Sequence, residues 1–154
     1  MPRFAVVDIG SHSARLEVVE ITGDGPPSVI GSERQVTRVG ESVFRTGRVS
    51  AEAVEVLCDV FGQMGELCRS LDVKGIRAVA TSALRDAANT AEFLPRWSAA
   101  LGAEIEVISG EEEARLIHDG VQLRWPGLEG RLLIFDIGGG SAELIVSVLF
   151  SSWA

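Results

Sequence analysis

A nine-residue segment that occurs twice constrains the fold of this 154-residue chain more than any other feature. DIGSHSARL begins at Asp8 and DIGGGSAEL begins at Asp136, so the copies are offset by 128 residues and agree at six of nine positions. Each copy follows an apolar run that is typical of a buried strand. A segment that returns once, about a domain length later, predicts two similar α/β units that face each other. We therefore expect residues 1–130 to form one unit and residues 131–154 to open a second.

The remaining segments alternate at the lengths of an α/β protein. Strands are predicted near residues 4–7, 16–21, 28–38, 76–80, 105–108 and 132–135. Helices are expected after Ser50, which can cap a long apolar stripe, and over residues 90–101 and 110–123. Pro95 predicts that the second of these helices starts late or is kinked. Residues 40–47 are interpreted as a loop.

Composition excludes several classes of protein. The chain carries 14 basic and 22 acidic residues and a single lysine, so it lacks the clustered basic face of a nucleic-acid binder. No segment approaches the roughly 20 apolar residues of a membrane span, and no signal peptide is recognised. The two cysteines lie ten apart on one expected helix, about 15 Å along its axis, and cannot pair. We expect a reduced, cytoplasmic protein in which local arginines, backbone amides or a metal ion would bind any anionic ligand.

Both copies of the repeat have the same chemical pattern. A carboxylate stands at the end of a strand, where α/β proteins place their sites, and glycine and small residues follow. Turns of this composition can present backbone amides to phosphate oxygens. The alternative is an ordinary β-hairpin turn, in which Asp-x-Gly is common. Two matching copies favour the phosphate-binding interpretation.

Helical geometry gives the three glutamates at residues 111–113 different expected roles. Ser109 as N-cap makes Glu112 the partner of a capping box, and Glu111 suits the helix dipole in the first turn. At about 100° per residue, Glu113 falls within the apolar arc of the helix. A carboxylate on a buried face is costly unless it is paired, bound to metal or functional. We interpret Glu113 as a general base with a raised pKa, the alternative being a partly exposed acid at the edge of the arc.

Other polar residues give weaker signals. Arg85 and Asn89 stand four apart and share a face if their segment is helical. The forked donors of Arg85 suit phosphate, although a surface arginine in a local ion pair has the same sequence pattern. His12 and His118 show no metal-ligand spacing, and His118 is expected on the polar, solvated side of its helix.

Four motifs occur in order: DIGSHSARL, ATSALRDAAN, ISGEEEARLI and FDIGGGSAEL. Over residues 4–147 the chain resembles the N-terminal half of the exopolyphosphatase/guanosine pentaphosphate phosphohydrolase (Ppx/GppA) family. The resemblance implies an α/β fold of the actin-like ATPase type (ribonuclease H-like), in which two lobes enclose the phosphate chain. This chain would then comprise the first lobe and the opening hairpin of the second, and we expect it to be a fragment that lacks one wall of the cleft.

The resemblance also implies a function and a set of residues. It implies a Mg²⁺-dependent hydrolase that removes terminal phosphate from inorganic polyphosphate or guanosine pentaphosphate, with Glu113 as the catalytic base and Asp136 and Glu143 as metal ligands. The phosphate-binding residues would be Asp8, Gly10, Ser11, His12, Ser13, Arg85, Asn89, Gly138, Gly139, Gly140 and Ser141, with Asn89 supporting the loop that carries Arg85. The family usually has asparagine at the position of His12, so we expect an altered pH dependence there.

The expected partners and the alternatives follow from this resemblance together with the composition and the repeat. We expect a polyphosphate or nucleotide substrate, no nucleic acid, no membrane, and a homodimer when the protein is full length. A small-molecule kinase of the same fold, or a non-catalytic fragment that binds phosphate or nucleotide, stays open as an alternative. An unfinished strand over residues 144–150 would leave an edge that can pair with another chain.

Overall fold

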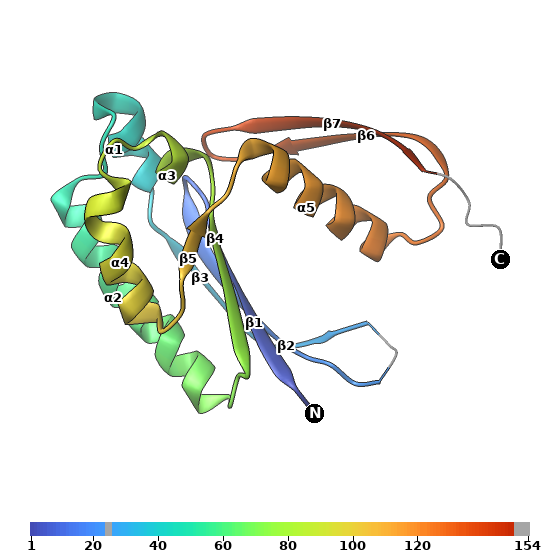
Figure 1. Ribbon diagram of the computed structural model, residues 1–154, viewed down its shortest axis with the longest axis horizontal. Helices are drawn as coiled ribbons and strands as arrows, with labels where there is room; N and C mark the ends of the chain where they lie inside the picture. Colours follow the sequence, from blue (N-terminus) through green and yellow to red (C-terminus); the bar gives the residue numbers. More distant parts are fainter. Residues whose placement is uncertain (24–25, 150–154) are drawn as a thin grey trace.

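The computed structural model describes residues 1–23 and 26–149 (Figure 1). In chain order the elements are β1 (Arg3–Ile9), β2 (Ser13–Glu20), β3 (Ser28–Val36), α1 (Val39–Thr46), α2 (Ala51–Ser70), β4 (Gly75–Ala80), α3 (Ser82–Asp86), α4 (Thr90–Leu101), β5 (Ile105–Val107), α5 (Gly110–Arg124), β6 (Gly130–Ile137) and β7 (Ala142–Leu149). All six predicted strands and the three predicted helices are present, which confirms the α/β class.

The strands form two separate sheets. The larger has the order β3-β2-β1-β4-β5, in which β1, β2 and β3 are antiparallel neighbours while β4 is parallel to both β1 and β5. The smaller is the antiparallel hairpin β6–β7. The break between the sheets falls near the expected boundary at residue 130, and the assignment of two domains stays a prediction.

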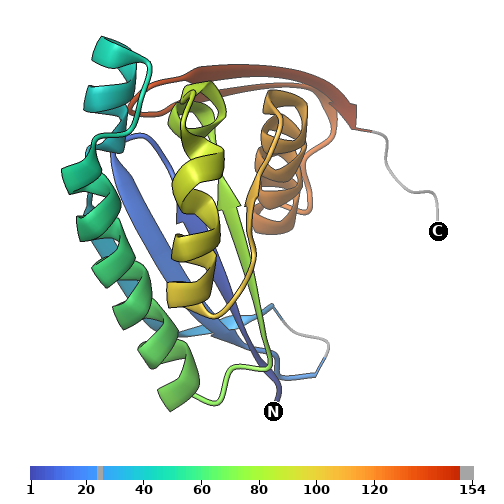
Figure 2. The same cartoon turned by 60° about the vertical axis from the view of Figure 1, so that its left-hand side comes forward.

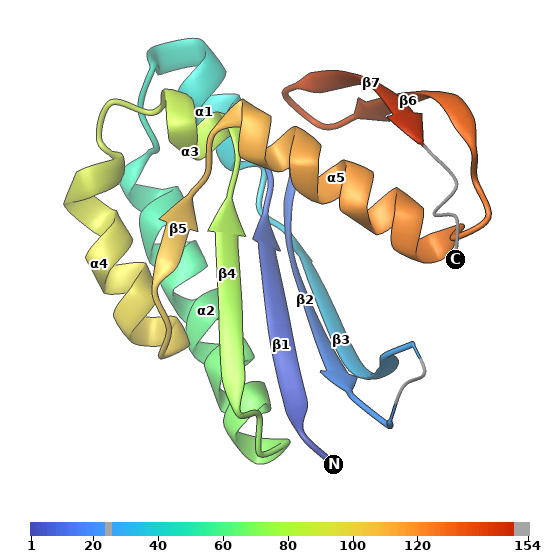
Figure 3. The same ribbon diagram turned by 45° about the vertical axis from the view of Figure 1, so that its right-hand side comes forward.

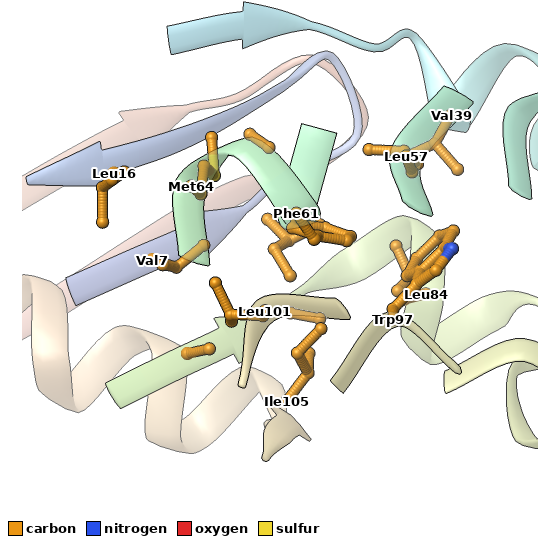
Figure 4. Packing of buried hydrophobic residues seen from close by; sticks show 14 of the residues in the cluster. Val7, Leu16, Val39, Leu57, Phe61, Met64, Leu84, Trp97, Leu101 and Ile105 are labelled. Atoms are coloured by element: carbon orange, nitrogen blue, oxygen red, sulfur yellow. The ribbon is translucent and has the colours of Figure 1, made fainter. Parts of the chain in front are cut away.

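Helices α2 and α4 lie side by side on one face of the larger sheet (Figure 2). Apolar side chains from the sheet and both helices meet between these layers (Figure 4). The members that are least exposed include Val7, Leu16, Leu57, Phe61, Met64, Trp97 and Leu101. The predicted apolar stripe of α2 is therefore core, and Cys68 within it is a packed thiol whose pKa is raised by burial.

Three local features support this helix pair. The Ser50 hydroxyl accepts a hydrogen bond from the Ala53 amide and caps α2, as expected. A Cβ added at Gly65 would lie 2.6 Å from the Leu101 carbonyl oxygen, so only glycine allows α2 and α4 to approach this closely. The Trp97 indole then donates to the Val54 carbonyl across the same interface at 3.0 Å.

Helix α5 lies on the other side of the sheet from α2 and α4, and the β6–β7 hairpin packs against it (Figure 3). Both lie toward the end of the sheet where the parallel strands β1 and β4 finish. Carboxyl ends of parallel strands are the usual place for a site in α/β proteins. The fold therefore brings the second copy of the repeat to the end of the strand that carries the first.

Two predictions about helices were wrong. Residues 40–47 are not a loop, because α1 spans Val39–Thr46, buries Val39 and Val43 in the core, and ends at Gly47 in a left-handed conformation. Tertiary burial outweighs the poor helix propensity of its glycine and serine. Helix α4 does not start late: it begins at Thr90 and contains Pro95, and the packing of Phe93 and Trp97 supports the turn that lacks one backbone donor, while a kink at Pro95 stays a prediction.

Within residues 1–23 and 26–149, no helix is both long and apolar enough to cross a membrane.

Candidate active site

The two copies of the repeat fold into equivalent turns. In the first, Asp8 stands opposite Arg15 across β1–β2 and the Gly10 amide donates to the Ser13 carbonyl at 3.0 Å. In the second, the same bond runs from Gly138 to Ser141 at 2.9 Å. Each copy is therefore a β-hairpin turn, which was the alternative to a phosphate-binding turn. The two turns nevertheless meet at one place.

That place is a hollow of about 360 Å³ between the larger sheet, the start of α5 and the β6–β7 hairpin. Its lining combines residues from both turns with a glutamate from α5 and residues from β3 and the end of β4. The lining residues are Asp8, Gly10, Ser11, His12, Ser13, Arg34, Thr81, Glu113, Asp136, Ile137, Gly138, Gly139, Ser141 and Glu143. Ten of the predicted residues other than Glu113 thus lie together, and Glu113 lies with them.

Glu113 enters the hollow from the first turn of α5. Ser109 positions that turn, because its hydroxyl accepts from the Glu112 amide at 3.1 Å. The reciprocal half of the expected capping box is not formed, since the Glu112 carboxylate binds Arg115 instead. The Glu113 side chain is 13% exposed and lies on the less exposed side of the helix, although no residue of α5 is fully buried.

Arg85 holds the Glu113 carboxylate. Both terminal nitrogens of the guanidinium donate to Glu113 Oε2 at 3.2 Å, and one also donates to the Ile108 carbonyl at 2.8 Å. Burial raises the pKa of Glu113, and the nearby Glu143 and Asp8 raise it further, while Arg85 opposes the shift. The result is a carboxylate that is held in place by a cation and has an elevated affinity for a proton, as a general base requires.

Negative charge dominates the hollow. Asp8 keeps exposed surface, but burial of its carboxylate by the surrounding walls raises its pKa, and Asp136 adds to the shift while Arg15 opposes it. Across β6–β7, Asp136 stands directly opposite Glu143. In the first copy of the repeat, an acidic residue therefore stands opposite a basic one across the hairpin. In the second copy, two acidic residues stand opposite each other. Like charges directly opposite in a sheet are destabilising, so this second pair is costly unless its charge is neutralised.

Two glycines of the second turn allow it to pack closely against the first turn. A Cβ at Gly139 would lie 2.7 Å from the His12 Cβ, and one at Gly140 would overlap the Phe44 ring and lie 2.6 Å from Ser11 Oγ. Neither glycine has a positive φ. Close approach of the two turns, rather than backbone freedom, explains both residues. Gly140 does not line the hollow and packs against Phe44 and Ser11, so its expected contact with phosphate stays a prediction.

The position of Asn89 differs in one respect from the expected one. Helix α3 ends at Asp86, so Asn89 does not share a helical face with Arg85. Its amide instead accepts from the Val49 amide at 2.9 Å and donates to the Val49 carbonyl at 3.0 Å. The side chain is buried and lies outside the hollow, and its bonds to Val49 agree with the loop-supporting role that the resemblance implied, while its contact with phosphate stays a prediction.

Three polar residues at or near the site were not predicted from the sequence: Thr81, which follows β4, Arg34 and His118. Arg34 of β3 lines the hollow, and only the register of three strands reveals it, because nothing in its local sequence marks it. His118 is not solvated as expected: its Nε2 lies 2.8 Å from Ser147 Oγ and links α5 to β7. An i, i+4 contact with Gln122 adds to this link.

The family model described as "Ppx/GppA phosphatase family" matches residues 17–151. The chain belongs to this family. Curated relatives include a guanosine-5'-triphosphate,3'-diphosphate pyrophosphatase from Vibrio cholerae, 35% identical over 153 residues, and exopolyphosphatase 1 from Mycobacterium bovis, 34% identical over 143 residues. These alignments cover 99% and 92% of this chain but only 30% and 41% of the relatives.

Solved structures of Ppx/GppA proteins have the same fold. The family member from Aquifex aeolicus superposes with a TM-score of 0.85 at 35% identity, and an exopolyphosphatase from Cytophaga hutchinsonii with 0.88 at 29%. Each superposition covers 96% of this chain and 47% or 48% of the other. The ethanolamine utilization protein EutJ from Carboxydothermus hydrogenoformans, with a TM-score of 0.50 at 17% identity, shares the fold alone. The expected actin-like α/β fold is thereby confirmed.

The donor set of this Ppx/GppA site can be tested against Mg²⁺. Among the described residues, no three histidine, cysteine or acidic side chains come together as a complete metal cluster. Mg²⁺ usually binds one or two carboxylates and completes its shell with water and substrate phosphates. Asp136 and Glu143 offer such a pair of hard oxygen ligands on adjacent strands of the hollow. The residues fit the ion.

Proposed function

We propose that this protein is a phosphohydrolase that releases terminal phosphate from inorganic polyphosphate or guanosine pentaphosphate. One observation carries the proposal: a half-buried glutamate with a raised pKa faces a hollow that two phosphate-type turns line together. The family supports it, because curated relatives are named for both substrates. The chain spans less than half of the length of those relatives, so the activity is proposed for the intact protein.

Glu113 would act as the general base. Its carboxylate can accept a proton from a water that attacks the terminal phosphorus, and Arg85 fixes its orientation through two hydrogen bonds of 3.2 Å. A pKa raised by burial improves proton transfer near neutral pH. The base and the turns enter the hollow from different elements, which leaves room for a phosphoryl group between them.

The turns would bind the terminal phosphate. Backbone amides and the hydroxyls of Ser11, Ser13 and Ser141 are donors around the hollow, and His12 can donate from its ring. Stabilisation of charge by such preorganised donors is usually the largest contribution to catalysis.

Mg²⁺ bound by Asp136 and Glu143 would neutralise charge on the phosphate oxygens. This role also resolves the electrostatic problem of the hollow, where four acidic side chains would otherwise repel an anion. We further propose that the intact protein is cytoplasmic and forms a homodimer.

The direct test is release of phosphate by the intact protein from polyphosphate and from guanosine pentaphosphate, with Mg²⁺ and with chelator. We expect release that depends on Mg²⁺, and we expect Asp136→Asn to weaken the response to the ion. No release from either substrate would contradict the proposal. ATP with candidate acceptors provides the other arm, because phosphorylation of an acceptor would identify a kinase instead.

A further inference from the structure

Arg34 occupies a position in the hollow that the proposed mechanism does not use. It is exposed on β3, and its Nε donates to Ser13 Oγ of the first turn at 3.3 Å. It is the only arginine or lysine among the described residues that line the hollow, which also include four acidic side chains. Ser13 engages a single nitrogen, so the two terminal nitrogens of the guanidinium are available to a ligand.

The charge of Arg34 has no partner among the described residues. None of their carboxylates lies within 4.0 Å of its guanidinium, whereas Arg85 is paired with Glu113. Across β2–β3, Arg34 stands directly opposite Arg15, which itself only approaches Glu17 at 3.9 Å. Two like charges opposite each other in a sheet are destabilising, and an anion shared between them relieves the repulsion.

The order of the strands places Arg34 and Glu113 on different sides of the hollow. Arg34 belongs to β3 at one edge of the sheet, and Glu113 follows β5 at the other edge. Asp8 and Ser13, on β1 and β2, lie between them in that order. A chain of phosphates whose end lies at Glu113 therefore passes the first turn before it reaches Arg34.

We propose that Arg34 binds the phosphate groups that follow the terminal one and so selects a phosphoanhydride chain over a single phosphate. The inference rests on the proposed function and adds an orientation of the substrate to it. Arg34 is then a substrate-binding residue, because its contact lies away from the bond that breaks. Its removal should weaken binding of a chain without weakening binding of inorganic phosphate.

The test compares Arg34→Ala and Arg34→Lys with Arg131→Ala in the intact protein. Arg131 is an exposed arginine of β6 that does not line the hollow, so its loss controls for net charge. For tripolyphosphate we expect Arg34→Ala to raise KM at least about tenfold, the effect of losing a hydrogen bond to a charged group, with little change in kcat. Arg34→Lys should recover part of this loss. The inhibition constant of inorganic phosphate should change by less than about twofold in Arg34→Ala.

An unchanged KM in Arg34→Ala, or an equal rise in Arg131→Ala, would overturn the inference. If the wild-type protein releases no phosphate, the proposed function fails, and calorimetric binding of tripolyphosphate still decides the role of Arg34. Weaker binding by Arg34→Ala than by wild type supports the inference in that case. Equal binding, or no binding by the wild type, overturns it. Circular dichroism verifies that each variant is folded.

Discussion

At the scale of the residue, the proton affinity of Glu113 depends on opposing neighbours. Burial, Glu143 and Asp8 raise its pKa, and Arg85 lowers it. Arg85→Gln removes the cation, so the pKa of Glu113 should rise further. A base works only when it is deprotonated, and the acid limb of phosphate release should therefore move to higher pH.

Titration of the Glu113 carboxylate by NMR in metal-free protein measures this shift directly. Arg115→Gln is the matched control, because Arg115 pairs with Glu112 and Asp119 on the same helix and should leave Glu113 unchanged. A pKa that stays constant or falls in Arg85→Gln would refute the role assigned to this ion pair.

Helical periodicity was sufficient to single out Glu113, because the arc that it shares with apolar residues is a local property of the sequence. The role of Asn89 was not predictable in this way. Its partner Val49 lies 40 residues earlier, and a buried amide that satisfies backbone groups has the same local sequence as one that binds a ligand.

At the scale of the element, Asn89 ties the start of α4 to the segment before α2. Asn89→Ala leaves the amide and carbonyl of Val49 without partners in a buried place, and we expect the free energy of unfolding to fall by about 1–3 kcal/mol. The KM of folded protein should not change, because Asn89 lies outside the hollow. Urea denaturation and steady-state kinetics check the two parts.

Gln63→Ala, at an exposed position of α2, is the control. Its free energy of unfolding should stay within about 0.5 kcal/mol of that of the wild type. A rise in KM for Asn89→Ala without a loss of stability would restore the original assignment of Asn89 to phosphate.

Most elements were predictable because their apolar periodicity is clear, as in α2. Helix α1 was not, since its glycine and serine are typical of loops and its burial depends on contacts with distant strands. Gly40, for example, donates its amide to the Ser11 carbonyl of the first turn at 2.8 Å. Tertiary contacts determine whether such segments are helical.

At the scale of the whole molecule, one face of the β6–β7 hairpin is apolar and exposed. The exposed fractions range from 52% to 80% for Leu133, Phe135, Ile137, Leu144, Val146 and Val148. Contiguous apolar surface of this kind favours association. We expect the 154-residue chain to self-associate with rising concentration, and Val146→Lys to reduce this.

Sedimentation velocity over a concentration series tests the expectation. Leu123→Lys on α5 is the control, because Leu123 is 71% exposed but does not belong to this face. A chain that stays monomeric at every concentration would contradict it.

The repeat predicted from sequence that two turns would serve one site, because both copies end a strand with the same residues. It did not predict how they meet. Glycines at 139 and 140 allow the turns to touch, and the register of β1, β2 and β3 aligns Asp8, Arg15 and Arg34 in one row. Both relations are set by the packed fold rather than by local sequence.

The central claim is that Glu113 acts as a base on a phosphoryl group held between the two turns. Phosphate release by Glu113→Gln in the intact protein tests it most directly, with the exposed Glu111→Gln as control. We predict that Glu113→Gln lowers kcat by roughly 10²–10⁴-fold while Glu111→Gln retains the wild-type rate. Retention of more than about a tenth of the rate by Glu113→Gln would contradict the claim.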